Sequence, residues 1–324
     1  MLSANQISEK INRYLKDLTY SRNPKGLYDP IEYVLSLGGK RIRPTLMIMA
    51  YELFKENTDS ILDQAAGVEI YHNFTLLHDD LMDCADKRRS NPTVHIKWNS
   101  NTAILSGDAM TVLAYQYLSN CKDQYLSKVL KIFNRTAMEI CEGQELDMEF
   151  EQRNDVAEAE YIEMIRLKTA VLLAASLKIG AVLAGASDED AEQLYQFGIQ
   201  IGLAFQLQDD YLDVYGNAEN FGKNIGGDIL CNKKTYLLIK ALSIANDTQQ
   251  KELGRWLSKK EFDPKEKITT VTNIYTQLNI SSYCNKIIED YYTEGLRCLE
   301  RVSVNKERKQ ALKNYSQKLM HRKM

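Results

Sequence analysis

The chain has 324 residues, 44% of them hydrophobic, and its 41 Lys and Arg residues nearly balance 44 Asp and Glu residues, leaving a net charge of −3. A chain of this length can bury a large core, but its charge gives no general attraction to nucleic acid or to an anionic membrane. We therefore exclude nucleic acid as a partner and expect the basic groups to act locally.

The termini and cysteines indicate the compartment. The first ten residues contain no apolar signal segment, and the most apolar stretch, residues 170–185, is interrupted by Lys178. We expect neither secretion nor a membrane span. The six cysteines show no paired ligand spacing, which is typical of reduced thiols. The sequence predicts a cytoplasmic protein without zinc.

The first distinctive segment runs from Gly38 to Pro44 and contains two glycines, three cations and a proline. Glycines permit a close approach of the backbone, and proline is well suited to the first turn of a helix. Together with the cations, they predict a loop that grips a phosphate group.

An acidic run follows at residues 79–83, and a second one lies at residues 209–213. On a helix, positions i and i+4 lie nearly above one another and position i+1 lies close by, so three carboxylates can converge on one cation. Each run is flanked by apolar residues, where unneutralised carboxylates would be poorly hydrated. A single run is more often a solvated helix face, but the duplication favours a Mg²⁺ site that binds a phosphate.

Basic groups follow both acidic runs. Arg88 and Arg89 come directly after the first run, and the Asn91-Pro92 step predicts a turn that ends the helix there. We expect these arginines at the edge of the carboxylate site, although an exposed basic loop is an equally simple interpretation. After the second run, residues 221–235 combine three glycines with lysines, which indicates a loop that folds over an anion, although such combinations are common in ordinary turns.

Helical periodicity dominates the rest of the chain. Apolar residues recur at three- and four-residue spacing over four long stretches, namely residues 103–118, 127–150, 159–185 and 189–213, and no proline occurs between Pro92 and Pro264. Helix boundaries are expected near Asn99, Ser187, Asn246 and Asp263. Because no low-complexity linker separates the acidic runs, which we expect to face each other, we predict one all-α domain over residues 1–324.

In chain order, these motifs resemble the trans-isoprenyl diphosphate synthases, the polyprenyl synthetases that make geranyl, farnesyl and geranylgeranyl diphosphate. The resemblance covers nearly the whole chain and rests on Gly38-Gly39-Lys40, His78-Asp79-Asp80, Gly143-Gln144 with Asp147, Lys168-Thr169, residues 205–210 and Gly222-Lys223. It implies an isoprenoid synthase fold, a bundle of roughly ten or more helices around a central cavity. It also implies a homodimer.

The implied reaction is a head-to-tail condensation of isopentenyl diphosphate with an allylic diphosphate, which is dimethylallyl, geranyl or farnesyl diphosphate. Mg²⁺-assisted ionisation of the allylic substrate would release diphosphate and give trans-prenyl diphosphates of C15 to C20. The resemblance implies three Mg²⁺ ions per site, with Mn²⁺ able to substitute. No covalent nucleophile is required.

The resemblance also assigns roles to individual residues. The metal-binding residues would be Asp79, Asp80, Asp83, Asp209, Asp210 and Asp213, of which Asp210 and Asp213 are expected to hold metal-bound waters or to orient the site. The allylic diphosphate would be bound by Arg88, Lys168, Lys223 and Lys233. The catalytic group would comprise Lys168, Thr169, Gln206, Lys223 and Lys233. Isopentenyl diphosphate would be bound without metal by Lys40, Arg43, His72 and Arg89.

His72 has a second interpretation, since a lone helical histidine is often only a structural hydrogen-bonding residue. His72 lies seven residues before Asp79, so it returns to nearly the same helix face. This position favours the interpretation that His72 binds substrate.

Product length is predicted to depend on residues below the first acidic run on the same helix. Thr75 is one turn below Asp79, at roughly 6 Å, and Tyr71 is roughly 12 Å below it, with the bulky Phe74 alongside. A small residue above bulky ones indicates C15 to C20 products, and the resemblance of Phe74 and Thr75 to the same positions in geranylgeranyl-type synthases favours C20. The alternative is that these are ordinary core residues and another helix forms the floor.

One position departs from the family pattern, because Ser90 stands where glycine is usual. If that position needs a positive φ, serine would be strained and could shift Arg89.

Two other classes of protein remain open for this chain. A terpene cyclase would normally lack the second all-Asp motif and the Lys40 loop, and a non-catalytic partner subunit would have lost carboxylates or cations. The basic Arg322-Lys323 could cap the second-substrate site.

Overall fold

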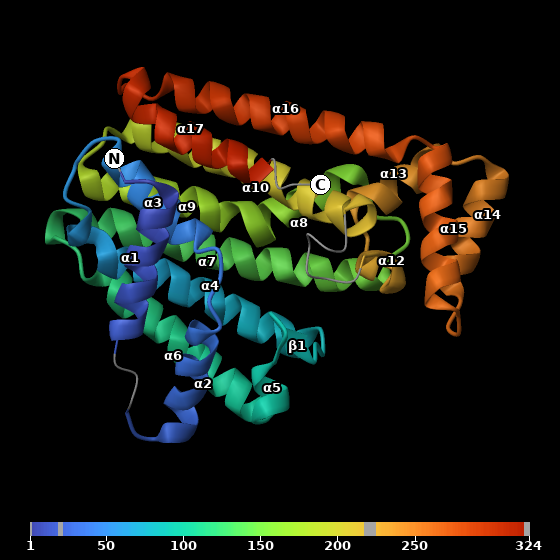
Figure 1. Cartoon of the computed structure of the whole chain (residues 1–324), viewed down its shortest axis with the longest axis horizontal. Helices are drawn as coiled ribbons and strands as arrows, with labels where there is room; N and C mark the ends of the chain where they lie inside the picture. The colour runs from blue at the N-terminus through green and yellow to red at the C-terminus, as the bar shows by residue number, and fades with distance from the viewer. Residues whose placement is uncertain (1, 19–21, 217–224, 321–324) are drawn as a thin grey trace. The chain divides into compact units, whose positions relative to one another are not determined.

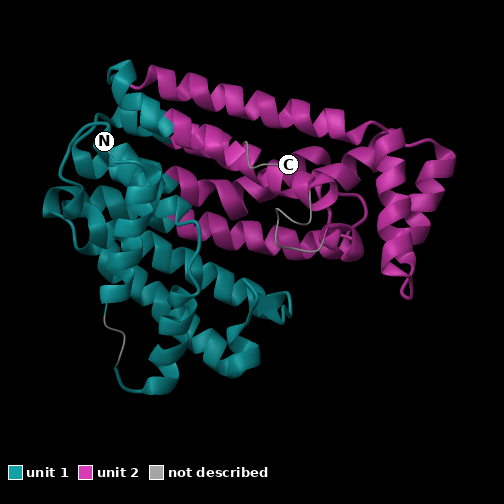
Figure 2. Ribbon diagram, viewed as in Figure 1, with its two compact units in different colours: residues 1–134, 175–194, 303–312 teal, residues 135–174, 195–302, 313–324 magenta. Residues whose placement is uncertain are grey.

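The computed structural model describes residues 2–18, 22–216 and 225–320, and these residues are almost entirely helical apart from one short hairpin. The predicted all-α class is confirmed. The chain divides into two compact units (Figure 2). Unit 1 contains residues 1–134, 175–194 and 303–312, and unit 2 contains residues 135–174, 195–302 and 313–324. The extent of the domain, residues 1–324, stays a prediction.

Unit 1 is centred on a long helix, α4 (Leu62–Met82), which packs most extensively against α6 (Ser100–Ser119). The two backbones approach closely at Gly67, where a Cβ would lie 3.0 Å from the carbonyl oxygen of Ala114. The other elements wholly in unit 1 are α1 (Ala4–Asp17), α2 (Lys25–Ser36), α3 (Ile42–Glu52), the 3₁₀ helix η1 (Thr58–Ile61), β1 (Lys87–Arg88), β2 (Asn91–Pro92) and α5 (Val94–Lys97) (Figure 1).

Unit 2 holds α8 (Glu158–Ile165), a π-helical turn η2 (Arg166–Ala170), α12 (Gly227–Leu230), α13 (Tyr236–Ile244), α14 (Asp247–Ser258), α15 (Pro264–Gln277) and α16 (Ile280–Arg301). Four helices contribute residues to both units: α7 (Asp123–Gln152), α9 (Val171–Ala184), α10 (Asp188–Tyr215) and α17 (Lys306–Met320). The π turn interrupts an otherwise continuous helical stretch, and such turns frequently occur at functional sites.

The four long stretches with helical periodicity all form helices, and local capping explains three of the expected helix boundaries. Asn99 accepts a hydrogen bond from the backbone of Thr102 at the start of α6. Asn246 and Asp263 cap α14 and α15 in the same way, and Pro264 occupies the first turn of α15. Each cap leaves fewer unsatisfied amides at the helix end.

The predicted end of α4 is wrong. The helix ends at Met82, before the Asn-Pro step, because Cys84 adopts a left-handed conformation with a φ of 51°. The amides of Cys84 and Ala85 donate to the carbonyls of Leu81 and Asp80, which is the Schellman arrangement usually made by glycine. Asn91 and Pro92 instead form the second strand of the hairpin that follows.

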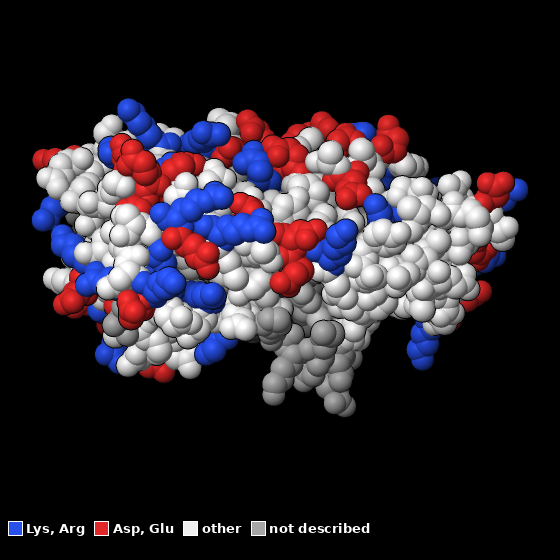
Figure 3. All heavy atoms as spheres, turned by 90° about the horizontal axis from the view of Figure 1, so that it is seen from above, with Lys and Arg blue, Asp and Glu red and all other residues white. Residues whose placement is uncertain are grey.

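Among the described residues, one helical segment, Glu158–Ala184, is long and apolar enough to cross a membrane, with a mean hydropathy of 1.7 in its most apolar window. However, 78% of that window is buried inside the protein, as in the core helix of a soluble protein. On the face seen in Figure 3, acidic and basic side chains alternate without a broad field of one sign.

Candidate functional site

The first acidic motif lies at the carboxyl end of α4 in unit 1. Asp79 and Asp80 belong to its last turns, and Asp83 is the exposed residue that ends it. Asp80 is only 5% exposed, and both of its carboxylate oxygens accept hydrogen bonds of 2.8 Å from Nε of Arg88. A second guanidinium nitrogen of Arg88 lies 3.7 Å from Asp79. The structure therefore places Arg88 beside the carboxylates, as predicted.

The hairpin β1–β2 presents Arg89 and Ser90 at its tip. Lys87 pairs with Pro92 and Arg88 with Asn91, so Arg89 and Ser90 are the two turn residues. Their φ values are 51° and 64°, which is the type I′ pattern that normally selects Asn-Gly. Ser90 thus occupies a conformation that favours glycine, and the strain considered for this position is present. Strained residues at such a tip often mark functional sites.

The loop between α2 and α3 lies against this tip. Gly38 and Gly39 have φ values of 75° and 143°, and Arg89 donates a hydrogen bond to the carbonyl of Gly38. A Cβ at Gly39 would lie 2.9 Å from the flexible guanidinium of Arg89, and the φ of 143° at this residue favours glycine. Lys40 is exposed at the end of the loop. The predicted approach of a phosphate to this backbone stays a prediction.

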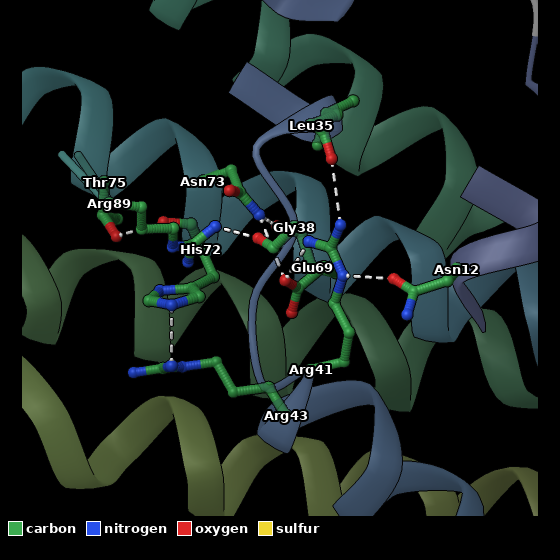
Figure 4. A network of polar contacts seen from close by, with 10 residues as sticks. All are labelled: Asn12, Leu35, Gly38, Arg41, Arg43, Glu69, His72, Asn73, Thr75 and Arg89. Carbon is green, nitrogen blue, oxygen red and sulfur yellow. Dashed lines mark hydrogen bonds and ion pairs between the residues drawn. The ribbon is translucent and has the colours of Figure 1, made fainter. Parts of the chain in front are cut away.

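Arg43 and His72 meet although 29 residues separate them, and their nitrogens lie 2.9 Å apart (Figure 4). Burial lowers the pKa of His72 well below its usual value, and Arg43, Arg89, Arg88 and Arg41 lower it further. His72 is therefore neutral near pH 7 and accepts from Arg43. Burial also lowers the pKa of Arg43 to about 10, opposed by Glu69, and burial lowers that of Arg89. These guanidiniums remain cationic at neutral pH.

The prediction that all three cations of the Gly38 to Pro44 segment grip phosphate is wrong for Arg41. Its side chain is 3% exposed and lies 2.7 Å from the buried carboxylate of Glu69. It also donates to Asn12 and to the carbonyl of Leu35. The sequence could not separate Arg41 from Lys40 and Arg43, because its partners lie on other helices.

In unit 2, the π turn η2 carries Lys168 and Thr169. Nζ of Lys168 lies 2.6 Å from Asp147 on α7, and Thr169 donates a hydrogen bond of 3.1 Å to Gln206 on α10. One turn before Asp147, a Cβ at Gly143 would lie 2.4 Å from the backbone nitrogen of Lys168. The absence of a side chain at Gly143 lets the π turn rest directly on α7.

The second acidic motif lies near the carboxyl end of α10, also in unit 2. Asp210 is 4% exposed, and its two oxygens accept hydrogen bonds from Gln206, at 3.0 Å, and from the hydroxyl of Tyr161. Burial raises the pKa of Asp210 to about 7, with a further increase from Asp228 that Lys233 opposes. Asp209 is partly exposed on the same turn.

Asp213 holds the segment after α10. Its carboxylate accepts a hydrogen bond of 3.0 Å from the amide of Asp228, and the amide of Lys233 donates to the carbonyl of Asp228 at 2.9 Å. Asp228 is a site residue that the sequence analysis missed. The available signal was its acidic side chain directly after Gly226-Gly227, at the start of a helix. Lys223 and Arg322-Lys323 lie outside the described residues.

The residues predicted to set product length lie in an aromatic cluster. Tyr71 is 2% exposed, and its ring centroid is 4.8 Å from that of Phe133 on α7 and 5.3 Å from that of Phe74. Phe74 in turn contacts His78. Thr75 donates its hydroxyl to the carbonyl of His72. Phe133 was not predicted, because helix periodicity on α4 says nothing about the facing helix.

The acidic residues suit Mg²⁺ if the substrate supplies part of the coordination. Among the described residues, no three His, Cys, Asp or Glu side chains form a ready-made ion cage. Mg²⁺ is usually held by one or two carboxylates together with waters and substrate phosphates. Asp79 and Asp83, four residues apart with at least partly exposed carboxylates, fit that arrangement.

Comparisons with known proteins agree with these motifs. A family model described as polyprenyl synthetase matches residues 24–275. A short chain isoprenyl diphosphate synthase of Methanocaldococcus jannaschii is 43% identical over 267 residues, which cover 82% of this chain and 81% of that protein. A geranylgeranyl diphosphate synthase of Sulfolobus acidocaldarius is 36% identical, with 92% and 91% covered. A crystal structure of a geranylgeranyl pyrophosphate synthase matches with a TM-score of 0.95 and 42% identity, and 100% of each chain is covered.

Proposed function

We propose that this chain, which belongs to the polyprenyl synthetase family, is a short-chain trans-isoprenyl diphosphate synthase. The enzyme would join isopentenyl diphosphate head-to-tail to an allylic diphosphate and release diphosphate. The observation that carries this proposal is the separation of charge within unit 1. Carboxylates gather at the end of α4 around Asp79, whereas guanidiniums gather around His72.

The guanidinium group suits a diphosphate that arrives without metal. Arg43 and Arg89 are cationic at neutral pH and surround a neutral histidine. Guanidinium forks match phosphate oxygens in a low-dielectric setting, where a hydrogen bond to a charged group is strong. With the exposed Lys40, these side chains would bind isopentenyl diphosphate.

The carboxylates suit a diphosphate that arrives with metal. We assign direct Mg²⁺ binding to Asp79, Asp80, Asp83 and Asp209, with three ions per site and Mn²⁺ as a substitute. Asp210 and Asp213 would hold metal-bound waters or orient the site, because Tyr161 and Gln206 donate to Asp210 and the amide of Asp228 donates to Asp213. When bound, Mg²⁺ would neutralise the charge that develops on the departing diphosphate.

The chain's own cations would complete the allylic site. Arg88 lies beside Asp79 and would reach the same diphosphate, and Lys168 and Lys233 add fixed positive charge, together with Lys223. Thr169 and Gln206 present oxygen atoms, and we assign them to stabilise positive charge on the allylic carbons as the carbon–oxygen bond breaks. No side chain needs to form a covalent bond with substrate.

We place the products at C15 to C20, with C20 favoured. The support is the aromatic cluster below the acidic motif, where buried Tyr71 is packed between Phe74 and Phe133. A floor made of three interlocked rings would stop chain growth. The relatives named as geranylgeranyl diphosphate synthases agree with the longer product.

Incubation of the protein with labelled isopentenyl diphosphate, Mg²⁺ and each of dimethylallyl, geranyl and farnesyl diphosphate tests this function. Linear C15 or C20 diphosphates, identified by mass, are expected. Excess EDTA should abolish turnover, and Mg²⁺ or Mn²⁺ should restore it. Cyclic hydrocarbons would instead identify a terpene cyclase, and a complete lack of turnover would favour a non-catalytic partner subunit.

We also propose that the enzyme is a cytoplasmic homodimer. Ile104, Leu105 and Val112 on α6 are 47%, 60% and 58% exposed, although all three are aliphatic. Leu105 and Val112 are seven residues apart and share one face of α6, which a second copy could cover. Light scattering should give twice the 37.2 kDa chain mass, and Leu105→Glu with Val112→Glu should give a monomer. A monomeric unaltered protein would refute this assembly.

A further inference from the structure

We propose that Arg41 and Glu69 are positioning residues that hold the isopentenyl diphosphate loop in its binding conformation without touching the substrate. This role rests on the proposed function. Every part of the Arg41 guanidinium is engaged inside the protein, with Nε 2.9 Å from Asn12, one Nη 2.7 Å from Glu69 and the other 2.9 Å from the carbonyl of Leu35 (Figure 4). The side chain is also only 3% exposed, which keeps these nitrogens away from a bound phosphate.

These three bonds connect four helices at one point. Arg41 itself is the residue before α3, Asn12 lies on α1, Leu35 on α2 and Glu69 on α4. The planar fork of an arginine suits three partners in different directions, because its donors are spread in a fixed geometry. The guanidinium therefore fixes where the loop between α2 and α3 sits relative to α4.

The loop needs this anchor because its backbone is otherwise weakly constrained. Gly38, Gly39 and Arg41 all have positive φ values, and Arg41 adopts φ 49° and ψ 39°. Glycine has little intrinsic preference for such a conformation, and an arginine disfavours it. The buried ion pair offsets that cost at Arg41 and holds the turn.

The anchored segment carries most of the proposed binding groups. Lys40 and Arg43 flank Arg41 in the sequence, and the carbonyl of Gly38 accepts the hydrogen bond from Arg89. Displacement of the turn would therefore move three of the four proposed binding side chains. The fourth, His72, would follow through its contact with Arg43.

Glu69 contributes from the side of α4. It lies three residues before His72, and its Oε1 also accepts from Asn73 at 3.2 Å. Its carboxylate opposes the effect of burial on the pKa of both Arg43 and Arg89, so it is the shared counter-charge of the guanidinium group. The pair thus sets both the geometry and the local charge of the loop.

The test uses Arg41→Lys, which keeps the charge but loses the fork, and the double variant Arg41→Met with Glu69→Met, which leaves no orphaned charge. Arg13→Lys is the matched control, because Arg13 is exposed on α1 beside Asn12. The KM of each substrate and the kcat are measured in the full-length enzyme with Mg²⁺, and circular dichroism monitors folding.

We expect both Arg41 variants to raise the KM of isopentenyl diphosphate by about tenfold to a hundredfold, because a displacement on the order of 1 Å is enough for such an effect. The KM of the allylic substrate should change by less than about threefold, and Arg13→Lys should leave both unchanged. Equal increases in the two KM values would show a merely structural role and overturn the proposal. An unchanged KM in either Arg41 variant would do the same.

The positioning role of Arg41 and the proposed function can be refuted separately. If the unaltered enzyme condenses the substrates but Arg41→Lys behaves like Arg13→Lys, only the positioning role is refuted. If the unaltered enzyme does not condense them, the proposed function is refuted and the positioning role falls with it.

Discussion

Replacement of Gly143 by alanine tests how closely the π turn must rest on α7. The added Cβ would lie 2.4 Å from the nitrogen of Lys168 and 2.8 Å from the carbonyl carbon of Leu167. Ordinary contacts begin at 3.4 Å, so the turn would have to move by about 1 Å, and both neighbours are backbone atoms that cannot rotate away. Lys168, now 2.6 Å from Asp147, would move with the turn.

Two effects of opposite sign determine the stability of Gly143→Ala. Overpacking costs about 1–3 kcal/mol, whereas alanine in place of glycine inside a helix gains up to about 1 kcal/mol. We expect a net loss of about 1–2 kcal/mol in the free energy of unfolding. The effect on catalysis should be larger, because a displacement of about 1 Å can lower kcat by roughly a hundredfold.

The assay compares kcat and urea unfolding for Gly143→Ala and a matched control, Gly254→Ala. Gly254 lies inside α14 in the same unit, and no atom lies within 4 Å of its Cβ position. The control should gain stability by up to about 1 kcal/mol and keep its kcat. A Gly143→Ala enzyme with normal kcat would show that the position of Lys168 is not set by this contact, and the reasoning would be refuted.

Three further predictions concern unit 1. Ser90→Gly should raise the unfolding free energy by about 0.5–1 kcal/mol, because glycine tolerates the positive φ, and an unchanged or lower value in urea unfolding would contradict the strain. Tyr71→Ser with Phe74→Ala should lengthen the product beyond C20, as read by mass, and the same length would disprove the floor. His72 has a lowered pKa when folded, so acid favours the unfolded state below its unfolded value of about 6.5. Between pH 6.5 and 5, the stability of His72→Asn should therefore fall less than that of the unaltered protein, by up to about 2 kcal/mol, and parallel curves would contradict this.

Features that depend on neighbouring residues could be predicted from the sequence. Asn99, Asn246 and Asp263 begin helices because each side chain bonds an amide only three residues away. The i and i+4 spacing of Asp79 and Asp83 likewise fixes their common face once α4 forms. In these cases, the interacting residues lie within about one helical turn of each other in the sequence.

Features that depend on distant partners could not be predicted. Arg41 is buried because Glu69 lies 28 residues away on another helix, whereas its neighbours in sequence look chemically alike. Tyr161 meets Asp210 across 49 residues, and nothing in either local pattern indicates the contact. Even the end of α4 was misjudged, because Cys84 takes the left-handed position that composition would assign to glycine. Pairing of Arg43 with His72 was anticipated only through the family resemblance.

The electrostatics of unit 1 explain how two substrates with the same head group could be told apart. A diphosphate without metal is repelled by the carboxylates near Asp79, but the guanidiniums near His72 attract it. A diphosphate that carries Mg²⁺ has lost most of its negative charge, so the guanidiniums attract it less and the carboxylates can share its metal. Glu69 offsets part of the positive charge of the guanidinium group, since its carboxylate raises the pKa of both Arg43 and Arg89. Discrimination of this kind needs no contact with the hydrocarbon part of either substrate, which the proposed function assigns to the aromatic cluster around Tyr71.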